Sequence, residues 1–487
     1  RLEMPGWSEP GFASTDWQPV ELVEKKTPQL IAEQAPPVQI TEEVSAVGLS
    51  EPVPGTFIFD MGQNMVGKYR LHVQGARGSR VFLRFGEMLN DDGTLYTENL
   101  RAARQTDVYI LKGEGPEIYE PHFTFHGFRY VEVTGFPGEP TADALVGLVM
   151  HNAVAPVGEF VCSDAMVNQL QSNIVWGARG NFVSTPTDCP QRDERCGWTG
   201  DAQVFVRTAC SNMDIATFFA KYMVAVEDGQ LPSGSFPHVA PDVPNYGYGS
   251  PAWGDAGVIV PWNLYLCYGD TAVLAKHYAA MTRWIAYLKE HSDNLLRPAE
   301  GYGDWLSVGA DTPKDVLATA YFANSTKLVS QIARVLGKEE DAKKYEALFA
   351  DICTAFNRAY VSSDGRIKGD TQTCYVLALH MDLLPENMRG KAASHLVRTV
   401  EEKDWHLSTG FLGVGLLLPV LSAIGRSDIA YRLLHNESYP SWGYSIRQGA
   451  TTIWERWNSY TKEQGFGDAG MNSFNHYALG SVGEWFY

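Results

Sequence analysis

The periodicity of hydrophobic residues changes near residue 158, which divides the chain into two parts. From about residue 55 to 155, short β-branched or aromatic runs such as "TFIFD", "KYRLHV" and "RVFLRFGE" are separated by Gly, Asp and Pro. Runs of this length and composition are typical of β-strands bounded by turns. Six or more of them at this spacing predict an all-β sandwich over residues 51–157.

After residue 158, apolar residues recur at positions i, i+3 and i+4, as on one face of an amphipathic helix. The clearest helical segments are 164–182, 271–292, 319–337 and 340–360. Further helices are predicted at 387–401, 411–424, 427–435, 448–458 and 473–484, and others begin near residues 201, 256 and 371. Twelve helices over residues 158–487 predict six hairpins closed into an all-α (α/α)6 toroid. An open helical solenoid is the alternative, although the sequence has no repeat of fixed length.

Residues 1–50 are rich in Pro and Glu, as in "AEQAPPVQITEEV". This composition indicates an extended connector from an upstream module, with room for edge strands. The chain opens with "RLEMPGW", which has neither an initiator Met nor a signal peptide. We therefore expect a fragment or a processed product.

Composition narrows the possible ligands. The net charge of −18 and the absence of a basic run argue against nucleic acid, whose binding depends on Lys and Arg. No stretch approaches the roughly 20 apolar residues that a membrane span needs. Aromatic residues make up 12% of the chain, and aromatic rings either stack on sugars or fill cores. Neutral or cationic ligands are favoured over polyanions.

The seven cysteines are an odd number and are widely scattered, which is not the pattern of a disulfide framework. This usage favours a reducing compartment such as the cytoplasm. Cys189 and Cys196 lack the spacing of zinc ligands, so the sequence predicts no metal and no other cofactor. Oligomeric state is not determined by these features.

Four loops are unusually long and rich in Trp and Tyr: 184–200, 231–255, 299–313 and 436–450. Loops longer than about 12 residues are usually functional or disordered, and the aromatic content argues against disorder. In a toroid these loops would converge at one mouth.

The stretch "TDCPQRDERCGWTGDAQ" (187–203) is the most concentrated of these loops in polar chemistry. It carries four carboxylates: Asp188, Asp193, Glu194 and Asp201. Pro and Gly residues exclude a helix until about Asp201, which stands at a plausible N-cap. One interpretation is that this loop presents a general acid to a substrate. The other is a surface ion cluster, in which Asp193 and Glu194 pair with Arg192 and Arg195.

A general acid or base usually has a partner that the fold brings close from elsewhere in the chain. The stretch "GATTIWERWNSY" (449–460) supplies one, because Glu455 lies between Trp454 and Trp457. A carboxylate among aromatic rings loses water, so we expect its pKa to rise. Alternatively, Glu455 pairs with Arg456 or Arg447.

Four motifs in this order, "TDCPQRDERCGWTGDAQ", "GYGDWLSVG", "GATTIWERW" and "NSFNHYALGSVGEWFY", resemble the bacterial and fungal α-L-rhamnosidases of glycoside hydrolase family 78. The resemblance extends into the β region through "DMGQNMVGKYRL", "FGEMLNDDGTLYTENLRAA" and "HFTFHGFRYVEVTG". Chains of this family continue past "GEWFY" into a C-terminal β-domain, which is apparently absent here.

The resemblance implies an inverting hydrolase that removes terminal α-L-rhamnose from a glycoside or oligosaccharide, with a β-sandwich packed on an (α/α)6 catalytic barrel. It places the general acid at Glu194 and the general base at Glu455. The substrate-binding residues that it implies are Asp188, Arg192, Trp198, Asp201, Trp253, Trp305 and His476. Rhamnose has a 6-methyl group, so one wall of the pocket should be apolar.

Other interpretations stay open at this point. The same toroid could act on another terminal sugar, or the chain could be a non-catalytic rhamnoside-binding protein. Trp253 and Trp305 could be core aromatics, and His476, in a predicted helix, could be a satisfied core histidine.

Overall fold

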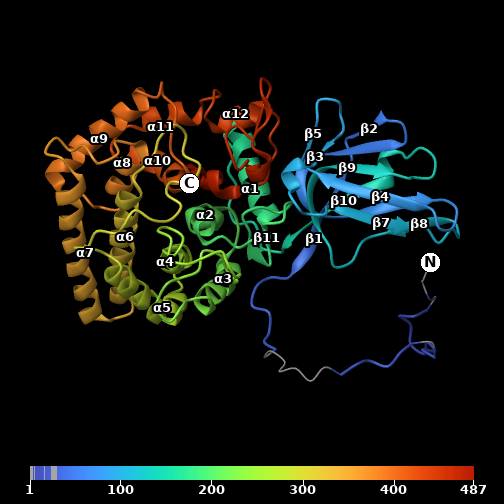
Figure 1. Cartoon of the computed structure of the whole chain (residues 1–487), viewed down its shortest axis with the longest axis horizontal. Helices are drawn as coiled ribbons and strands as arrows, with labels where there is room; N and C mark the ends of the chain where they lie inside the picture. The colour runs from blue at the N-terminus through green and yellow to red at the C-terminus, as the bar shows by residue number, and fades with distance from the viewer. Residues whose placement is uncertain (1–3, 5, 16, 23–29) are drawn as a thin grey trace.

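The computed structural model describes residues 4, 6–15, 17–22 and 30–487. A β-sheet domain lies beside a larger helical domain (Figure 1). The prediction of a β domain followed by an α domain is confirmed.

The β domain is built around one curled, antiparallel, eight-stranded sheet. Its strands are β1 (Val38–Ser45), β2 (Gly48–Val53), β3 (Thr56–Gln74), β4 (Arg80–Gly86), β7 (Thr106–Ile110), β8 (Pro116–Tyr119), β9 (His126–Thr134) and β10 (Leu145–Asn152). The order is β1-β10-β3-β9-β4-β7, and β2 and β8 also pair with β3. The long strand β3 thus has four partners, and its register with β9 shifts between Asp60 and Met65. A shift of this kind bends and twists a strand, which is consistent with the curl of the sheet.

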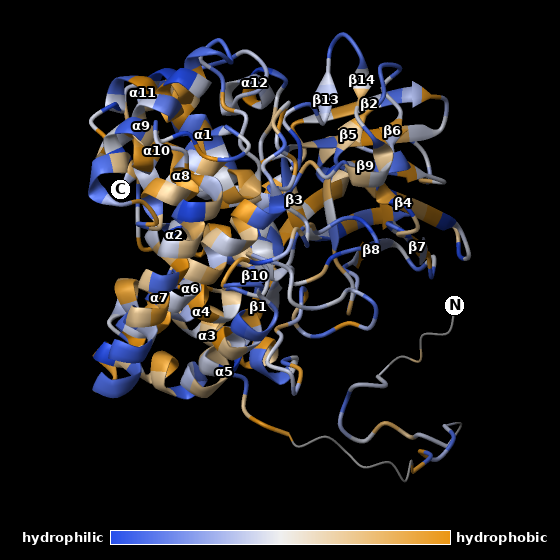
Figure 2. Cartoon of the chain, turned by 60° about the vertical axis from the view of Figure 1, so that its left-hand side comes forward, coloured by the Kyte–Doolittle hydropathy of each residue, from blue (hydrophilic) through white to orange (hydrophobic). Residues whose placement is uncertain are grey.

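The sheet begins at Val38, inside the segment whose composition predicts a connector. Strand β1 pairs with β10 at the edge of the sheet, and most of its side chains are exposed. An edge strand of this kind has no alternation of apolar residues to reveal it. The central strand β4 shows the opposite pattern, because Val81, Leu83 and Phe85 are fully buried and the intervening residues are exposed. Figure 2 shows the hydrophobic residues along β3 and β4.

The described residues form twelve α-helices after the sheet. They are α1 (Ala165–Asn181), α2 (Thr199–Asn212), α3 (Ala216–Asp228), α4 (Ala256–Tyr268), α5 (Thr271–Glu290), α6 (Lys314–Val335), α7 (Glu339–Tyr360), α8 (Gln372–His380), α9 (Glu386–Glu401), α10 (Phe411–Ala423), α11 (Ser427–Leu434) and α12 (Trp442–Arg447). Helices α4 and α10 are apolar nearly all round, as expected of helices that are buried within the domain. Contacts run from α2 through α4, α6, α8 and α10 to the 3-10 helix η4 (Tyr477–Phe486), and from η4 back to α2.

Two helix predictions are wrong, and two helices were not predicted. The segment 448–458 is irregular, because α12 ends at Arg447. The segment 473–484 becomes the 3-10 helix η4, which begins only at Tyr477. Helix α3, which three residues separate from α2, was not predicted. Helix α12 was not predicted either, because it lies in the segment 436–450, which was expected to be a loop. The spacing of apolar residues along the sequence reflects local structure. It does not reveal the tertiary contacts that hold residues 448–476 in an irregular path.

Short elements lie between the main strands and helices. They include the hairpin β5 (Met88–Leu89) with β6 (Leu95–Tyr96), the 3-10 helices η1 (Glu98–Leu100), η2 (Ala142–Ala144) and η3 (Ala469–Met471), and the hairpins β11 (Phe182–Val183) with β12 (Thr185–Pro186) and β13 (Tyr460–Thr461) with β14 (Gly465–Phe466). Helix α1 packs against β3 and β10. All seven cysteines are free thiols. No helix in the described part of the chain is both long and apolar enough to cross a bilayer.

The core of the sheet gives a direct test of the fold. Phe85 is fully buried and contacts the rings of Tyr69, His126 and Phe128, whereas Phe82 on the same strand is 39% exposed. We expect Phe85→Ala to lower the free energy of unfolding by roughly 3–5 kcal/mol. Phe82→Ala, the matched control, should cost about 1 kcal/mol or less. Denaturant unfolding measures both, and equal losses would contradict the assigned face of β4.

Candidate active site

A pocket of about 230 Å³ opens where loops of the helical domain meet the β domain. All nine residues that the sequence singles out line it: Asp188, Arg192, Glu194, Trp198, Asp201, Trp253, Trp305, Glu455 and His476. Five further lining residues were missed: Arg101, Tyr246, Tyr302, Phe411 and Met471. Tyr246 and Tyr302 lie in long aromatic loops that the sequence had already indicated, but nothing local marks the other three.

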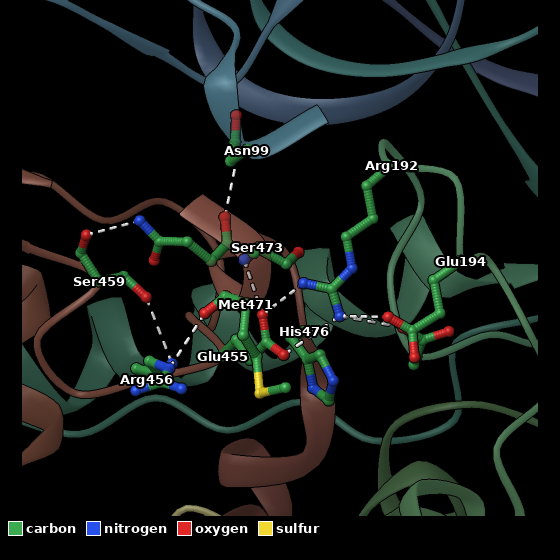
Figure 3. A network of polar contacts seen from close by, with 12 residues as sticks. Asn99, Arg192, Glu194, Glu455, Arg456, Ser459, Met471, Ser473 and His476 are labelled. Carbon is green, nitrogen blue, oxygen red and sulfur yellow. Dashed lines mark hydrogen bonds and ion pairs between the residues drawn. The ribbon is translucent and has the colours of Figure 1, made fainter. Parts of the chain in front are cut away.

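Arg192 is the centre of the site (Figure 3). Its Nη1 donates to Glu455 Oε2 at 2.7 Å, and its Nη2 lies 3.1 Å from Glu455 Oε1 and 2.7 Å from Glu194 Oε2. Asp188 is 3.5 Å away on the same side of the guanidinium. The Arg192 side chain is only 2% exposed. One buried cation therefore joins three carboxyl groups that come from two distant segments.

The loop that carries Arg192 is held by its own ends. The backbone N–H of Asp188 donates to the Cys196 carbonyl at 3.0 Å, and the N–H of Cys196 donates to Asp188 Oδ1 at 2.9 Å. These bonds close the loop, so Arg192 and Glu194 point inward while Arg195 is exposed. Glu194 does pair with Arg192, as the ion-cluster interpretation expected. The pairing lies inside the pocket and not on the surface.

Glu455 has a different partner from those that the sequence suggested. It pairs with Arg192 and not with Arg456 or Arg447. Its own N–H donates to the Ser473 carbonyl, and the Ser473 N–H donates back to Glu455 Oε2 at 2.8 Å. The neighbouring rings of Trp454 and Trp457 pack elsewhere, against other aromatic side chains.

The expected rise in the pKa of Glu455 is wrong. Burial by itself raises this pKa, but His476 when protonated, the Arg192 guanidinium and the Ser473 N–H stabilise the carboxylate, so the net pKa is lowered. Glu455 therefore stays ionised near neutral pH, as a group that accepts a proton must.

The pKa values of Asp188 and Asp201 shift in the opposite direction, because both are raised. Burial, together with the nearby charge of Glu194, raises the pKa of Asp188 to about 7. Burial and the charges of Asp188 and Glu194 also raise the pKa of Asp201. Asp201 is not the N-cap of its helix, because α2 begins at Thr199 and Asp201 lies in the first turn. Its side chain is thus free to face the pocket.

His476 lies just before η4 and is not inside a helix as predicted. Burial lowers its pKa to about 4, so the ring is neutral near pH 7. Its Nε2 is 3.5 Å from Asp201 Oδ1. Five buried polar atoms of this pocket have no hydrogen-bond partner in the described part of the chain: Asp188 Oδ2, Arg192 Nε, Asp201 Oδ1, Trp253 Nε1 and His476 Nδ1. Buried polar groups normally have partners, so this set is suited to a ligand with several hydroxyl groups.

Aromatic rings form the opposite wall. Tyr302 packs against three tryptophans, with ring centroids 5.6 Å from Trp198, 4.8 Å from Trp253 and 5.9 Å from Trp305. Gly200 lets Trp253 approach helix α2, because a Cβ there would lie 2.4 Å from the indole ring. Trp253 is buried, and its ring still lines the pocket.

Asp188, Cys189 and Glu194 could in principle hold a metal ion, since their ligand atoms lie within 4.8 Å of one another. Arg192 already compensates the two carboxylates. Burial also raises the pKa of the Cys189 thiol well above its ordinary value, which disfavours the thiolate that binds metals. The cluster is better described as an internal ion network.

A helical domain whose pocket combines paired carboxyl groups, unpartnered polar atoms and an aromatic wall has the features of a glycoside hydrolase. Residues 155–487 match the family model of the bacterial alpha-L-rhamnosidase six-hairpin glycosidase domain, and residues 50–151 match that of the bacterial alpha-L-rhamnosidase concanavalin-like domain. The chain therefore belongs to the bacterial α-L-rhamnosidase family.

Individual relatives cover the whole chain. An alpha-L-rhamnosidase of Streptomyces avermitilis is 55% identical over 100% of this chain and 47% of its own length. One from Formosa agariphila is 44% identical over 100% of this chain and 54% of its own. A crystal structure of the Streptomyces avermitilis alpha-L-rhamnosidase complexed with L-rhamnose matches with a TM-score of 0.98, covering 100% of this chain and 47% of that one. The chain spans about half the length of these relatives.

The ion network can be tested through stability. In Arg192→Met, Asp188 and Glu455 lose their cation, so we expect the free energy of unfolding at pH 7 to fall by roughly 3–5 kcal/mol. Loss of the cation raises the folded-state pKa of both carboxyls. A raised pKa removes stability as pH rises, so the deficit should be larger at pH 8 than at pH 5.

Arg195→Met is the matched control, because Arg195 is exposed on the same loop. Chemical unfolding at pH 5, 7 and 8 measures both variants. A deficit that does not depend on pH would show that Arg192 acts by packing alone.

Proposed function

We propose that the chain carries the catalytic site of an inverting glycoside hydrolase that removes terminal non-reducing α-L-rhamnose from rhamnosides. The observation that carries this proposal is the pair of carboxyl groups, Glu194 and Glu455, held on one guanidinium in a sugar-sized pocket. Membership of the family and the L-rhamnose complex of the Streptomyces avermitilis relative support the choice of sugar.

The finer architecture is part of the proposal. The cycle of contacts through α2, α4, α6, α8, α10 and η4 supports an (α/α)6 toroid over residues 158–487. The curled sheet supports a β-sandwich over residues 51–157, extended at one edge by β1. In this arrangement the loops that carry Glu194, Trp253 and Trp305 meet at one end of the toroid, against the β domain.

Glu455 is the general base in this mechanism. It accepts a proton from a water molecule as that water attacks the anomeric carbon. Its lowered pKa and its bond from Ser473 keep it ionised for this step. Glu194, which is 16% exposed, is the general acid and donates its proton to the glycosidic oxygen as the C–O bond breaks. Arg192 Nη2 contacts an oxygen of each carboxyl, and the two groups come from different segments. Inversion requires a separation of roughly 6.5–9.5 Å between acid and base, against roughly 5–5.5 Å for retention.

The remaining pocket residues recognise the sugar. Asp188, Asp201 and His476 have unpartnered atoms that can bind ring hydroxyls, and Arg192 is a further donor at its Nε, which also lacks a partner among the described residues. The wall formed by Tyr302 and the three tryptophans covers the apolar face of the ring and its 6-methyl group. As positive charge develops on the ring in the transition state, the nearby carboxylates stabilise it.

Proton NMR during digestion of an aryl α-L-rhamnoside tests the mechanism. With the wild-type chain, β-L-rhamnose should appear first. Glu455→Gln should lower kcat by roughly 10²–10⁴, because general-base catalysis contributes about that factor. Glu463→Gln, which removes an exposed carboxylate of the same C-terminal segment, should leave kcat near the wild-type value.

Each alternative has its own outcome. If α-L-rhamnose appears first, the inverting mechanism is wrong. Hydrolysis of another aryl glycoside in preference would reassign the sugar. A folded chain that binds L-rhamnose and hydrolyses nothing would be a binding protein.

A further inference from the structure

A side chain of the β domain contacts the carboxyl group of the proposed general acid directly. Arg101 follows the 3-10 helix η1 and lines the pocket, although the rest of the pocket belongs to the helical domain. Its Nη1 donates to Glu194 Oε2 at 3.1 Å and lies 3.6 Å from Asp193 Oδ1. The side chain is 29% exposed, so it stands nearer to solvent than Arg192 does.

Arg101 is fixed from several directions. Its Nε donates to the Gly470 carbonyl at 2.8 Å, and the N–H of the next residue, Ala102, contacts Asp193 Oδ2 at 3.3 Å. The backbone φ of Arg101 is +57°, in the left-handed region that residues other than glycine rarely adopt. Strain of this kind persists only where the surroundings enforce it, and it concentrates at functional sites.

The same part of the β domain also supports the segment beside Glu455. Asn99, two residues before Arg101, donates to the Asn472 carbonyl at 2.9 Å and to Glu87 at 3.1 Å (Figure 3). Glu87 in turn accepts the N–H of Phe474. These bonds hold the backbone on both sides of Ser473, whose N–H binds Glu455. One edge of the β domain therefore contacts the surroundings of both catalytic carboxyls.

The contacts of Glu194 distinguish its two oxygens. Oε2 faces two guanidinium groups, those of Arg101 and Arg192, whereas Oε1 accepts, among the residues that the structure describes, only the indole N–H of Trp198 at 2.9 Å. An oxygen that faces two cations is a poor site for a proton. The transferable proton is therefore carried on Oε1 and passes from there to the glycosidic oxygen.

We propose that Arg101 is a positioning residue for proton donation: by engaging Oε2 of Glu194 together with Arg192, it reserves Oε1 as the oxygen that protonates the leaving group. In this proposal the β domain contributes a residue to the active site. This inference rests on the proposed function, because it assumes that Glu194 is the general acid.

A series of leaving groups tests this role. Poor leaving groups such as simple alkyl alcohols need a proton as they depart, whereas 2,4-dinitrophenolate needs little help. We expect Arg101→Ala to lower kcat/KM by roughly 10²-fold on an alkyl α-L-rhamnoside and by less than about 3-fold on the dinitrophenyl rhamnoside. KM should change little, and Arg101→Lys should restore part of the loss by returning the cation.

Arg104→Ala is the matched control, since Arg104 is exposed on the same segment and does not line the pocket. Circular dichroism and the melting temperature of Arg101→Ala check that the chain is folded. An equal loss on every leaving group, or no loss on any, would overturn the role of Arg101. Absence of hydrolysis by the wild-type chain would instead overturn the proposed function, so the two failures are distinct.

Discussion

The site depends on one buried cation, because the carboxyl groups that surround Arg192 could not share a dry pocket without it. Isolated charges are costly to bury, and several like charges within a few ångströms would force most of them to take up protons. The Arg192 guanidinium offers a fork of donors: Nη1 and Nη2 both bind Glu455, and Nη2 also contacts Glu194. This geometry suits arginine better than lysine, whose ammonium is a compact point charge.

Around that cation, burial raises the pKa of each carboxyl, but the surrounding charges make the net shifts opposite. Glu455 faces positive charge and a backbone N–H, so its pKa falls although it is buried. For Asp188, burial and the charge of Glu194 outweigh the effect of Arg192, so the pKa rises. For Asp201, burial and the charges of Asp188 and Glu194 raise the pKa together. Neighbouring carboxyls with separated pKa values can take different roles: Glu455 stays ionised, as a proton acceptor must, whereas Asp188 and Asp201 hold protons more readily. The environment of each group, and not its residue type, decides which role it can take.

The chain fixes these groups through contacts between its two domains. Burial raises the pKa of Glu87, which lies between the domains, to about 7, and its carboxyl accepts N–H groups from Asn64, Asn99 and Phe474. The segment around Phe474 has little regular structure of its own, so these bonds supply the order that a helix would otherwise provide. The irregular path of residues 448–476 is therefore a consequence of the domain interface.

The sequence by itself determined the division into a β domain and an α domain, because the period of apolar residues records which face of an element is buried. The nine residues that line the pocket were indicated by the resemblance of the sequence motifs to a known family. Only the tertiary structure decided the irregular backbone at Glu455, its pairing with Arg192 and the direction of its pKa shift. Only the tertiary structure showed that Arg101 of the β domain lines the pocket. Those features arise between groups more than 90 positions apart, and local periodicity carries no information about which distant charges will meet.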